Sequence, residues 1–350
     1  MTKRDILTVL LTTFMSMALL YAPQPLFPVL AERFGVSQTT IASIITWSLL
    51  PMAVAPLFVG IFMQVVSPRR VLAGSAFLLG ASEVLFVMTE AFWGIVAIRF
   101  LQGALVSMLL AATMTYVSLQ ATRVARVMAL YVASSVLGGL LGRLAAGYGA
   151  AWVGIPAVFF GIAGLTLVSA GLAWGLTPEP RTPRRSIDLG RLADVLRTPS
   201  LTFLYGVVFS AFFVFTALLN YVPFRVSDLG VEGTGTAGLV YVGFLLGIAA
   251  SLLSHRVVEL VGGTLRAVAV GSLLLAGALA LAWVEALLAV MGAVIGASAG
   301  FFLLHAVLSG YVNEHAGKKA SSVNGLYVAI YYAGGAAGSY VPGLLYETAG

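Results

Sequence analysis

Four charged or titratable side chains interrupt the long apolar segments of this sequence and could do chemistry there. They are Arg99, Arg143, Glu83 and His305. If these segments cross a bilayer, a charge within one of them is costly unless it is paired or serves a function. An arginine could bind an anionic group, and histidine changes its charge close to neutral pH. These residues are therefore our candidates for binding a solute or for coupling its movement to protons.

Each of these residues also has a structural interpretation. Arg99 could bond to backbone carbonyls, and the long side chain of Arg143 could reach the membrane interface. His305 could be a satisfied core residue, and Glu83 could pair with an arginine or stay neutral and hydrogen-bonded. The sequence leaves both interpretations open for each residue.

Two further polar residues lie beside prolines near the ends of apolar segments. Gln24 follows Tyr21-Ala-Pro23, and Asn220 precedes Tyr221-Val-Pro223. Proline kinks a helix and leaves backbone carbonyls without donors, so these elements could be gates or plain helix ends. Tyr331 is one of several aromatic residues that could wall a ligand site or anchor the chain at the membrane interface. The others are Tyr21, Trp47, Tyr116 and Tyr327.

The composition excludes a soluble domain. Of the 350 residues, 60% are hydrophobic and 9% are charged, and the mean hydropathy is +1.02, whereas soluble domains carry about 25% charged residues. The absence of cysteine excludes disulfides, thiol catalysis and cysteine-bound metals, and we expect no cofactor or metal site. The basic residues lie between apolar runs, so the net charge of +6 does not indicate a nucleic-acid partner. Because the apolar runs are long and continuous, the sequence predicts an all-α integral membrane protein.

Apolar runs of about 20 residues, the length that crosses a bilayer, predict eleven transmembrane helices. They fall near residues 6–30, 38–64, 71–89, 91–117, 124–147, 152–176, 200–224, 235–254, 267–284, 286–311 and 320–344. With the N-terminus in the cytoplasm, every Lys and Arg lies in a cytoplasmic loop except Arg33 and Arg225, outside, and Arg99 and Arg143, within spans. The excess of Lys and Arg in the loops assigned to the cytoplasm agrees with the positive-inside rule and predicts a cytoplasmic N-terminus.

The spans divide into two related halves. Residues 1–176 hold six predicted spans, residues 177–199 form a cytoplasmic linker with a short amphipathic helix, and residues 200–350 hold five spans. The glycines at 138, 139 and 142 recur 196 positions later, and the Tyr-x-Pro element recurs after 200 positions. Both halves start with a span of the same direction, so the repeats are parallel. An equal second half would need a twelfth span, and the sequence ends where the loop before it should begin.

Three motifs carry a resemblance to a known family. The fourth span contains Arg99-Phe-Leu-Gln102-Gly103, the fifth contains the glycine-rich stretch 134–143, and the loop after the second contains residues 60–70. They resemble the R-x-x-Q-G motif, the antiporter motif and the G-x-L-x-D-R-x-G-R-K gating loop of the major facilitator superfamily, and the resemblance covers the whole chain. Gln64 stands where the family has aspartate, which removes the usual charge lock between helices. Gly139 replaces the usual proline of the antiporter motif, and Arg143 replaces its last glycine.

The resemblance assigns roles to the motif residues and to span ten. It implies gating or helix-packing roles for Gly60, Gln64, Arg69, Arg70, Gly103, Gly138, Gly139, Gly142, Gly334, Gly335 and Gly338. It also implies that the two glycine-rich helices meet at the interface between the halves, where small residues allow close approach. Gly300-Phe-Phe-x-x-His305, with Tyr331-Tyr332 in the next span, resembles bacterial efflux carriers of the YnfM type.

The resemblance implies a secondary transporter, not an enzyme, with two rocking halves around a site near the membrane centre. We expect proton-coupled efflux of a small organic solute through a bacterial inner membrane, by a monomer. A carrier for an organic anion or a neutral metabolite is the alternative. A membrane receptor or a lipid-modifying membrane enzyme is a further hypothesis of another class.

Overall fold

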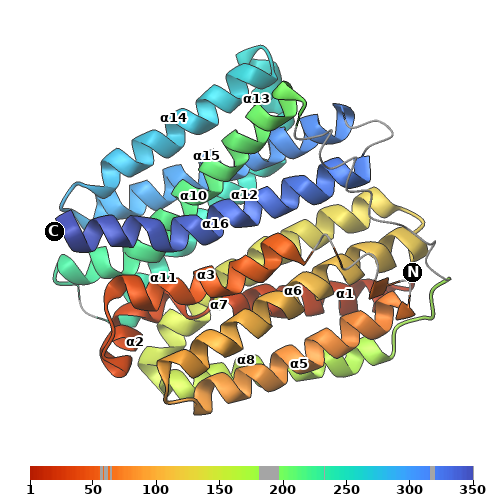
Figure 1. Cartoon of the computed structure of the whole chain (residues 1–350), viewed down its shortest axis with the longest axis horizontal. Coiled ribbons are helices and arrows are strands. Elements are labelled where there is room, and N and C mark those ends of the chain that lie inside the picture. The colour runs from red at the N-terminus through yellow and green to blue at the C-terminus, as the bar shows by residue number, and fades with distance from the viewer. Residues whose placement is uncertain are drawn as a thin grey trace.

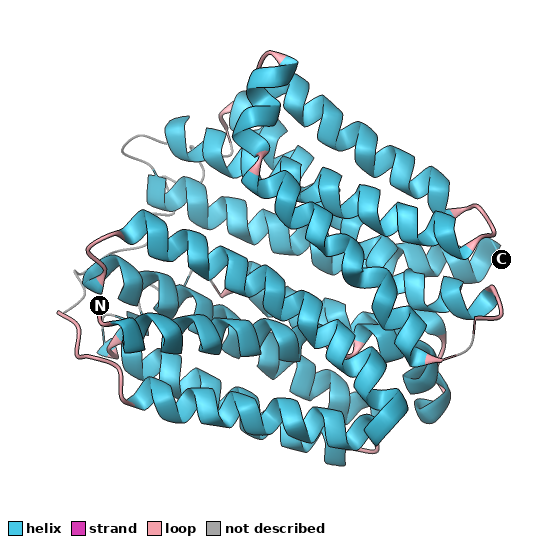
Figure 2. Cartoon of the chain, turned by 180° about the vertical axis from the view of Figure 1, so that it is seen from behind, coloured by secondary structure: helices cyan, strands magenta, loops and turns pink. Residues whose placement is uncertain are grey.

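The computed structural model describes residues 1–55, 58, 62–63, 65–180, 197–231, 233–315 and 320–349, and the regular structure of this part is helical (Figure 2). The first half consists of α1 (Lys3–Tyr21), η1 (Gln24–Leu26), α2 (Phe27–Phe34), α3 (Gln38–Val54), α5 (Pro68–Met88), α6 (Phe92–Gln120), α7 (Val124–Val153) and α8 (Ile155–Trp174). The second half consists of α10 (Pro199–Asp228), α11 (Thr234–Leu239), η2 (Val240–Gly243), α12 (Phe244–Leu252), α13 (Ser254–Val261), α14 (Thr264–Ala282), α15 (Leu287–His315) and α16 (Ala320–Ala349).

Every predicted span corresponds to one of these helices or to a broken helix. In the described part of the chain, nine helices are long and apolar enough to cross a membrane, and α3 is a shorter apolar helix. The linker helix predicted within 177–199 falls on residues 181–196, which lie outside the described residues.

The first predicted span is broken at Pro23. Helix α1 ends at Tyr21, and the chain continues through η1 into the short helix α2. Proline has no N–H, so Pro23 cannot donate to the carbonyl of Leu19 four residues earlier. The break therefore leaves carbonyls at the end of α1 that need donors from elsewhere.

The two halves lie side by side (Figure 1). Within the first half, α1 packs on α7 and α8, and α5 packs on α6 and α8; within the second, α10 packs on α16, and α12 and α14 pack on α15. The amino group of Met1 donates to the Gln120 carbonyl over 2.7 Å, so the start of α1 and the end of α6 share one end of the bundle. We call this the N-terminal end; the C-terminus lies at the opposite end (Figure 1).

The repeated glycines pack helices within each half. A Cβ on Gly138 would overlap the backbone of Phe14 in α1, and a Cβ on Gly334 would overlap the backbone of Phe209 in α10. Gly142 and Gly338 meet the same two partner helices one turn further along. The helices that carry these glycines do reach the other half, because α7 packs on α11 and α16 packs on α3, but the glycines themselves face helices of their own half. They lock α7 onto α1 and α16 onto α10, because the missing side chains allow backbone-to-backbone contact.

Candidate functional site

A cavity of about 460 Å³ lies between the two halves. It extends from Gln24 and Arg143 to Val132 near the start of α7 and Leu252 at the end of α12. The last two side chains are 51% and 76% exposed, so the cavity opens toward the N-terminal end. This volume is within the range of sites for small organic molecules.

The halves contact each other between the cavity and the opposite end. The Thr234 hydroxyl donates to the Gly147 carbonyl over 2.7 Å and thereby joins α11 to α7. The rings of Phe27 and Phe224, from α2 and α10, lie 6.3 Å apart. Helix α3 packs along α16. These contacts close the cavity at the end opposite the N-terminus.

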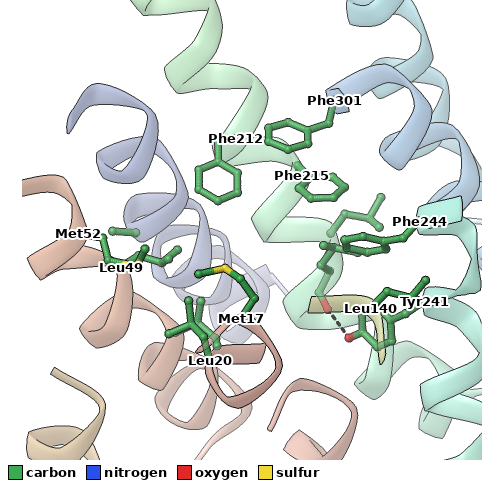
Figure 3. Packing of buried hydrophobic residues seen from close by; sticks show 14 of the residues in the cluster. Met17, Leu20, Leu49, Met52, Leu140, Phe212, Phe215, Tyr241, Phe244 and Phe301 are labelled. Carbon is green, nitrogen blue, oxygen red and sulfur yellow. Dashed lines mark hydrogen bonds between the residues drawn. The ribbon is translucent and has the colours of Figure 1, made fainter. Parts of the chain in front are cut away.

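Aromatic rings from the second half form one side of the cavity. Phe212 stacks on Tyr331 at 4.1 Å, and Phe215 stacks on Phe301 at 4.2 Å. Figure 3 shows Phe212, Phe215 and Phe301 facing one another, with Phe244 beyond them. We call Phe212, Phe215, Phe301 and Tyr331 the aromatic wall. Stacked rings offer a flat apolar surface for a ligand.

Arg143 is 2% exposed and lines the cavity. Its Nε donates to Gln24 Oε1 over 2.6 Å, and its Nη1 donates to the Gly139 carbonyl over 2.7 Å. The guanidinium carbon lies 4.3 Å from the ring centroid of Tyr21 and 4.8 Å from that of Phe244. The side chain thus points into the protein between aromatic faces. It does not extend to the membrane interface, which was the structural interpretation of this residue.

Gln24 and Asn220 meet across the two halves. Gln24 Nε2 donates to Asn220 Oδ1 over 2.5 Å, and both residues are fully buried. Because Gln24 also accepts from Arg143, the three side chains form a continuous chain of hydrogen bonds. The polar residues beside the two Tyr-x-Pro elements therefore join the halves at the closed side of the cavity.

His305 lines the cavity on α15. Its Nδ1 lies 3.1 Å from the hydroxyl of Tyr327, and its ring centroid lies 4.9 Å from that of Tyr331. His305 lies about one helical turn nearer the N-terminal end than Phe301, because α15 runs toward that end. The histidine and the arginine thus face the same cavity at different depths.

Arg99 and Glu83 lie away from the cavity and belong to a buried cluster in the first half. Arg99 donates to the carbonyls of Leu19 and Leu20, and its Nη1 also donates to Gln102 Oε1 over 2.8 Å. Gln102 Nε2 in turn donates to Glu83 Oε2 over 2.7 Å. Arg99 therefore supplies the donors that α1 lacks where Pro23 breaks it.

The two arginines of the gating motif lie in the first turn of α5, at the N-terminal end. Arg69 forms an ion pair with Glu179 at 3.7 Å, and its backbone N–H also donates to this carboxylate. Arg70 is exposed, whereas Gly60 and Gln64 lie outside the described residues. A Cβ on Gly103 would overlap the Ser48 backbone, so this glycine packs α6 on α3. Glu179, which follows α8, therefore binds the start of α5 through Arg69.

Several site residues carry little signal in the sequence. Tyr241 donates to the Leu219 carbonyl over 2.8 Å (Figure 3). Its ring centroid also lies 5.1 Å from the guanidinium carbon of Arg143. Phenylalanines are frequent in apolar spans, so a single one does not indicate a site. The spacing of Phe212 and Phe215, three residues apart on one helix face, is the one pattern that could have pointed to the aromatic wall.

Comparison with known protein families identifies the family of this chain. Residues 9–339 match the family model for the Major Facilitator Superfamily. The chain belongs to this superfamily. This major facilitator is 23% identical over 340 residues to an uncharacterized transporter of Buchnera aphidicola subsp. Schizaphis graminum, with 94% of this chain and 81% of the relative covered. It is 28% identical over 215 residues to the inner membrane transport protein YnfM of Escherichia coli, with 59% and 52% covered.

Solved structures show the same fold as this major facilitator. A bacterial homologue of the human lysosomal transporter Spinster, inward-facing and unoccupied, superposes with a TM-score of 0.74 at 13% identity and covers 99% of this chain and 84% of its own. The human organic anion transporter MFSD10 superposes with a TM-score of 0.72 at 20% identity and covers 98% and 93%. The family and the relatives identify this major facilitator as a multi-pass membrane transporter of small molecules.

Proposed function

We propose that this major facilitator exports a small organic solute from the bacterial cytoplasm in exchange for protons, by alternating access. The observation that carries the proposal is the cavity between the halves, closed by contacts between the halves on one side and open on the other. Rocking the halves about this cavity would open the closed side and close the open one. A solute held in the cavity would then change sides.

The distribution of basic residues supports loading from the cytoplasm. Lys3, Arg69 and Arg123 lie at the N-terminal end, as do Arg256 and Arg266. Such an excess of positive charge favours the cytoplasmic side. The cavity opens at this end, so a solute would enter it from inside the cell. The likeness to an inner membrane transport protein supports the same membrane.

His305 is our candidate for the proton site. It lines the cavity and is paired with the uncharged hydroxyl of Tyr327, and its other neighbours are the rings of Phe301 and Tyr331. Histidine gains or loses a proton close to neutral pH, as a residue that exchanges a proton for a solute requires. A proton and a solute would occupy the same cavity in alternation.

The test uses purified protein in liposomes that hold a pH-sensitive dye and an acidic lumen. Organic anions, organic cations, sugars and amino acids are added outside, one at a time. Exchange predicts that a transported solute makes the lumen more alkaline, and that His305→Gln loses this response. The matched control is His255→Gln on α13, where the histidine side chain is 84% exposed and outside the cavity.

Two results would contradict the proposal. Solute flux without any movement of protons, or with protons moving in the same direction, would exclude exchange. Solute binding without flux would indicate a receptor, and the transport proposal would fail.

A further inference from the structure

We infer that Arg143 binds the carboxylate of an amphipathic organic monoanion, whose apolar body lies along the aromatic wall. This inference rests on the proposed function and names the class of solute. It starts from the one permanent charge among the residues that line the cavity in the described part of the chain.

The charge of Arg143 has neutral partners in this state. Its hydrogen bonds go to the Gln24 side-chain amide and to the Gly139 carbonyl, and three aromatic rings surround the guanidinium. The cavity lining holds no aspartate or glutamate in the described part of the chain. A buried cation without a counter-charge is costly, and a bound anion would remove most of this cost.

Arg99 provides an internal comparison, because it is the other buried arginine among the described residues. Its Nη1 and Nη2 donate to the carbonyls of Leu19 and Leu20 and to Gln102, its buried Nε has no acceptor among the described residues, and the side chain is outside the cavity lining. Arg143 uses Nε and Nη1, and no described residue accepts from its Nη2. A guanidinium that lines a cavity and keeps a donor without an acceptor suits a carboxylate, which accepts in a fixed planar geometry.

The rest of the cavity indicates the body of the solute. Beyond Arg143 the wall consists of Phe215 and Phe301 and then Phe212 and Tyr331, and His305 follows at the N-terminal side. Flat aromatic or alkyl groups fit such a wall, and His305 could hydrogen-bond a polar group at the other end. One arginine compensates one negative charge, so the cavity favours a monoanion over a dianion.

The test compares three probes that share one ring system and differ in charge. They are naphthaleneacetate, naphthaleneacetamide and naphthylethylamine, each titrated at neutral pH into purified protein by calorimetry and thermal shift. We expect the anion to bind about tenfold or more tightly than the amide, as a charge-assisted hydrogen bond predicts. Arg143→Gln should remove this difference, and Arg143→Lys should keep part of it.

The controls separate charge from folding and binding from transport. Arg33→Gln removes an exposed arginine outside the cavity and should leave the preference intact. Phe215→Leu should weaken all three probes to a similar extent. Equal or tighter binding of the amine, or an unchanged preference in Arg143→Gln, would overturn the inference. Proton-coupled flux of the amine would overturn the inference but support the proposed transport function. Binding of the anion at Arg143 without flux would support the inference but contradict the transport function.

Discussion

The side chain of Gln24 donates to that of Asn220 over 2.5 Å, and this hydrogen bond joins the two halves across the closed side of the cavity. The residues are 196 positions apart: Gln24 follows Pro23 at the break after α1, and Asn220 lies three residues before Pro223 within α10. The Nδ2 of Asn220 is buried and has no partner among the described residues. This polar contact adds to the packing of α11 on α7 and of α3 on α16. A single hydrogen bond of this kind could break and form again during alternating access.

Weakening this contact should open the closed side. Loss of one hydrogen bond costs about 1 kcal/mol, so Asn220→Ala should shift the population of open molecules by about fivefold. The chain has no cysteine, so a single cysteine can report accessibility. Thr39→Cys replaces a residue that is 2% exposed beside Gly343. We expect a membrane-impermeant maleimide to label it faster in the Asn220→Ala background.

The control for that measurement is Glu32→Cys, which places the thiol on an exposed position at the same end of the bundle. Its labelling rate should be the same in both backgrounds. An unchanged rate at position 39 would show that Gln24 and Asn220 do not hold the halves together.

The glycine contacts should matter for stability in both halves. Gly138→Ala and Gly334→Ala would each push a Cβ into the backbone of the partner helix, and overpacking of this kind costs about 1–3 kcal/mol. The matched control is Gly161→Ala on α8, where a Cβ would meet nothing within 4 Å. We expect a lower melting temperature for the first two variants and an equal or higher one for the third. Equal effects at all three positions would contradict the packing role.

Replacing Arg99 should reduce the stability of the fold more than it affects solute binding. Arg99→Met would remove the donors to the end of α1 and leave Glu83 and Gln102 without the arginine, and breaking a buried charged cluster costs about 3–5 kcal/mol. The expected result is poor thermal stability, with the preference between charged probes unchanged in the protein that still folds. A normal melting temperature together with lost solute binding would instead place Arg99 in the binding site.

Transport of a monoanion should depend on the membrane potential. Export of an anion and entry of a proton both move positive charge inward, and each charge gains about 2.3 kcal/mol per 100 mV of inside-negative potential. Liposomes loaded with naphthaleneacetate should therefore release it faster when potassium and valinomycin make the lumen negative. Equal rates at both polarities would contradict anion-for-proton exchange.

The helices of this protein are predictable from its sequence, and most contacts of the site are not. Apolar length determines the spans, and Pro23 lies at the break of the first one. In contrast, Arg99 and Arg143 both stand within apolar runs, and their different roles depend on which helix lies opposite each of them. The glycine repeat predicts close packing, but the partner helices follow from the three-dimensional arrangement.

Arg143 lines the cavity and its Nε donates to Gln24, so the depth that a bound solute reaches should affect the contact between the halves. A molecule that stays near Leu252 would leave the hydrogen bonds between Arg143, Gln24 and Asn220 intact, and we expect no transport in that case. A carboxylate that accepts from both Nη2 and Nε would compete with Gln24 for Nε and loosen the link between Gln24 and Asn220. We expect this arrangement to suppress uncoupled movement of protons and solutes. An empty cavity or a poorly fitting molecule would leave the hydrogen bonds that close the cavity intact.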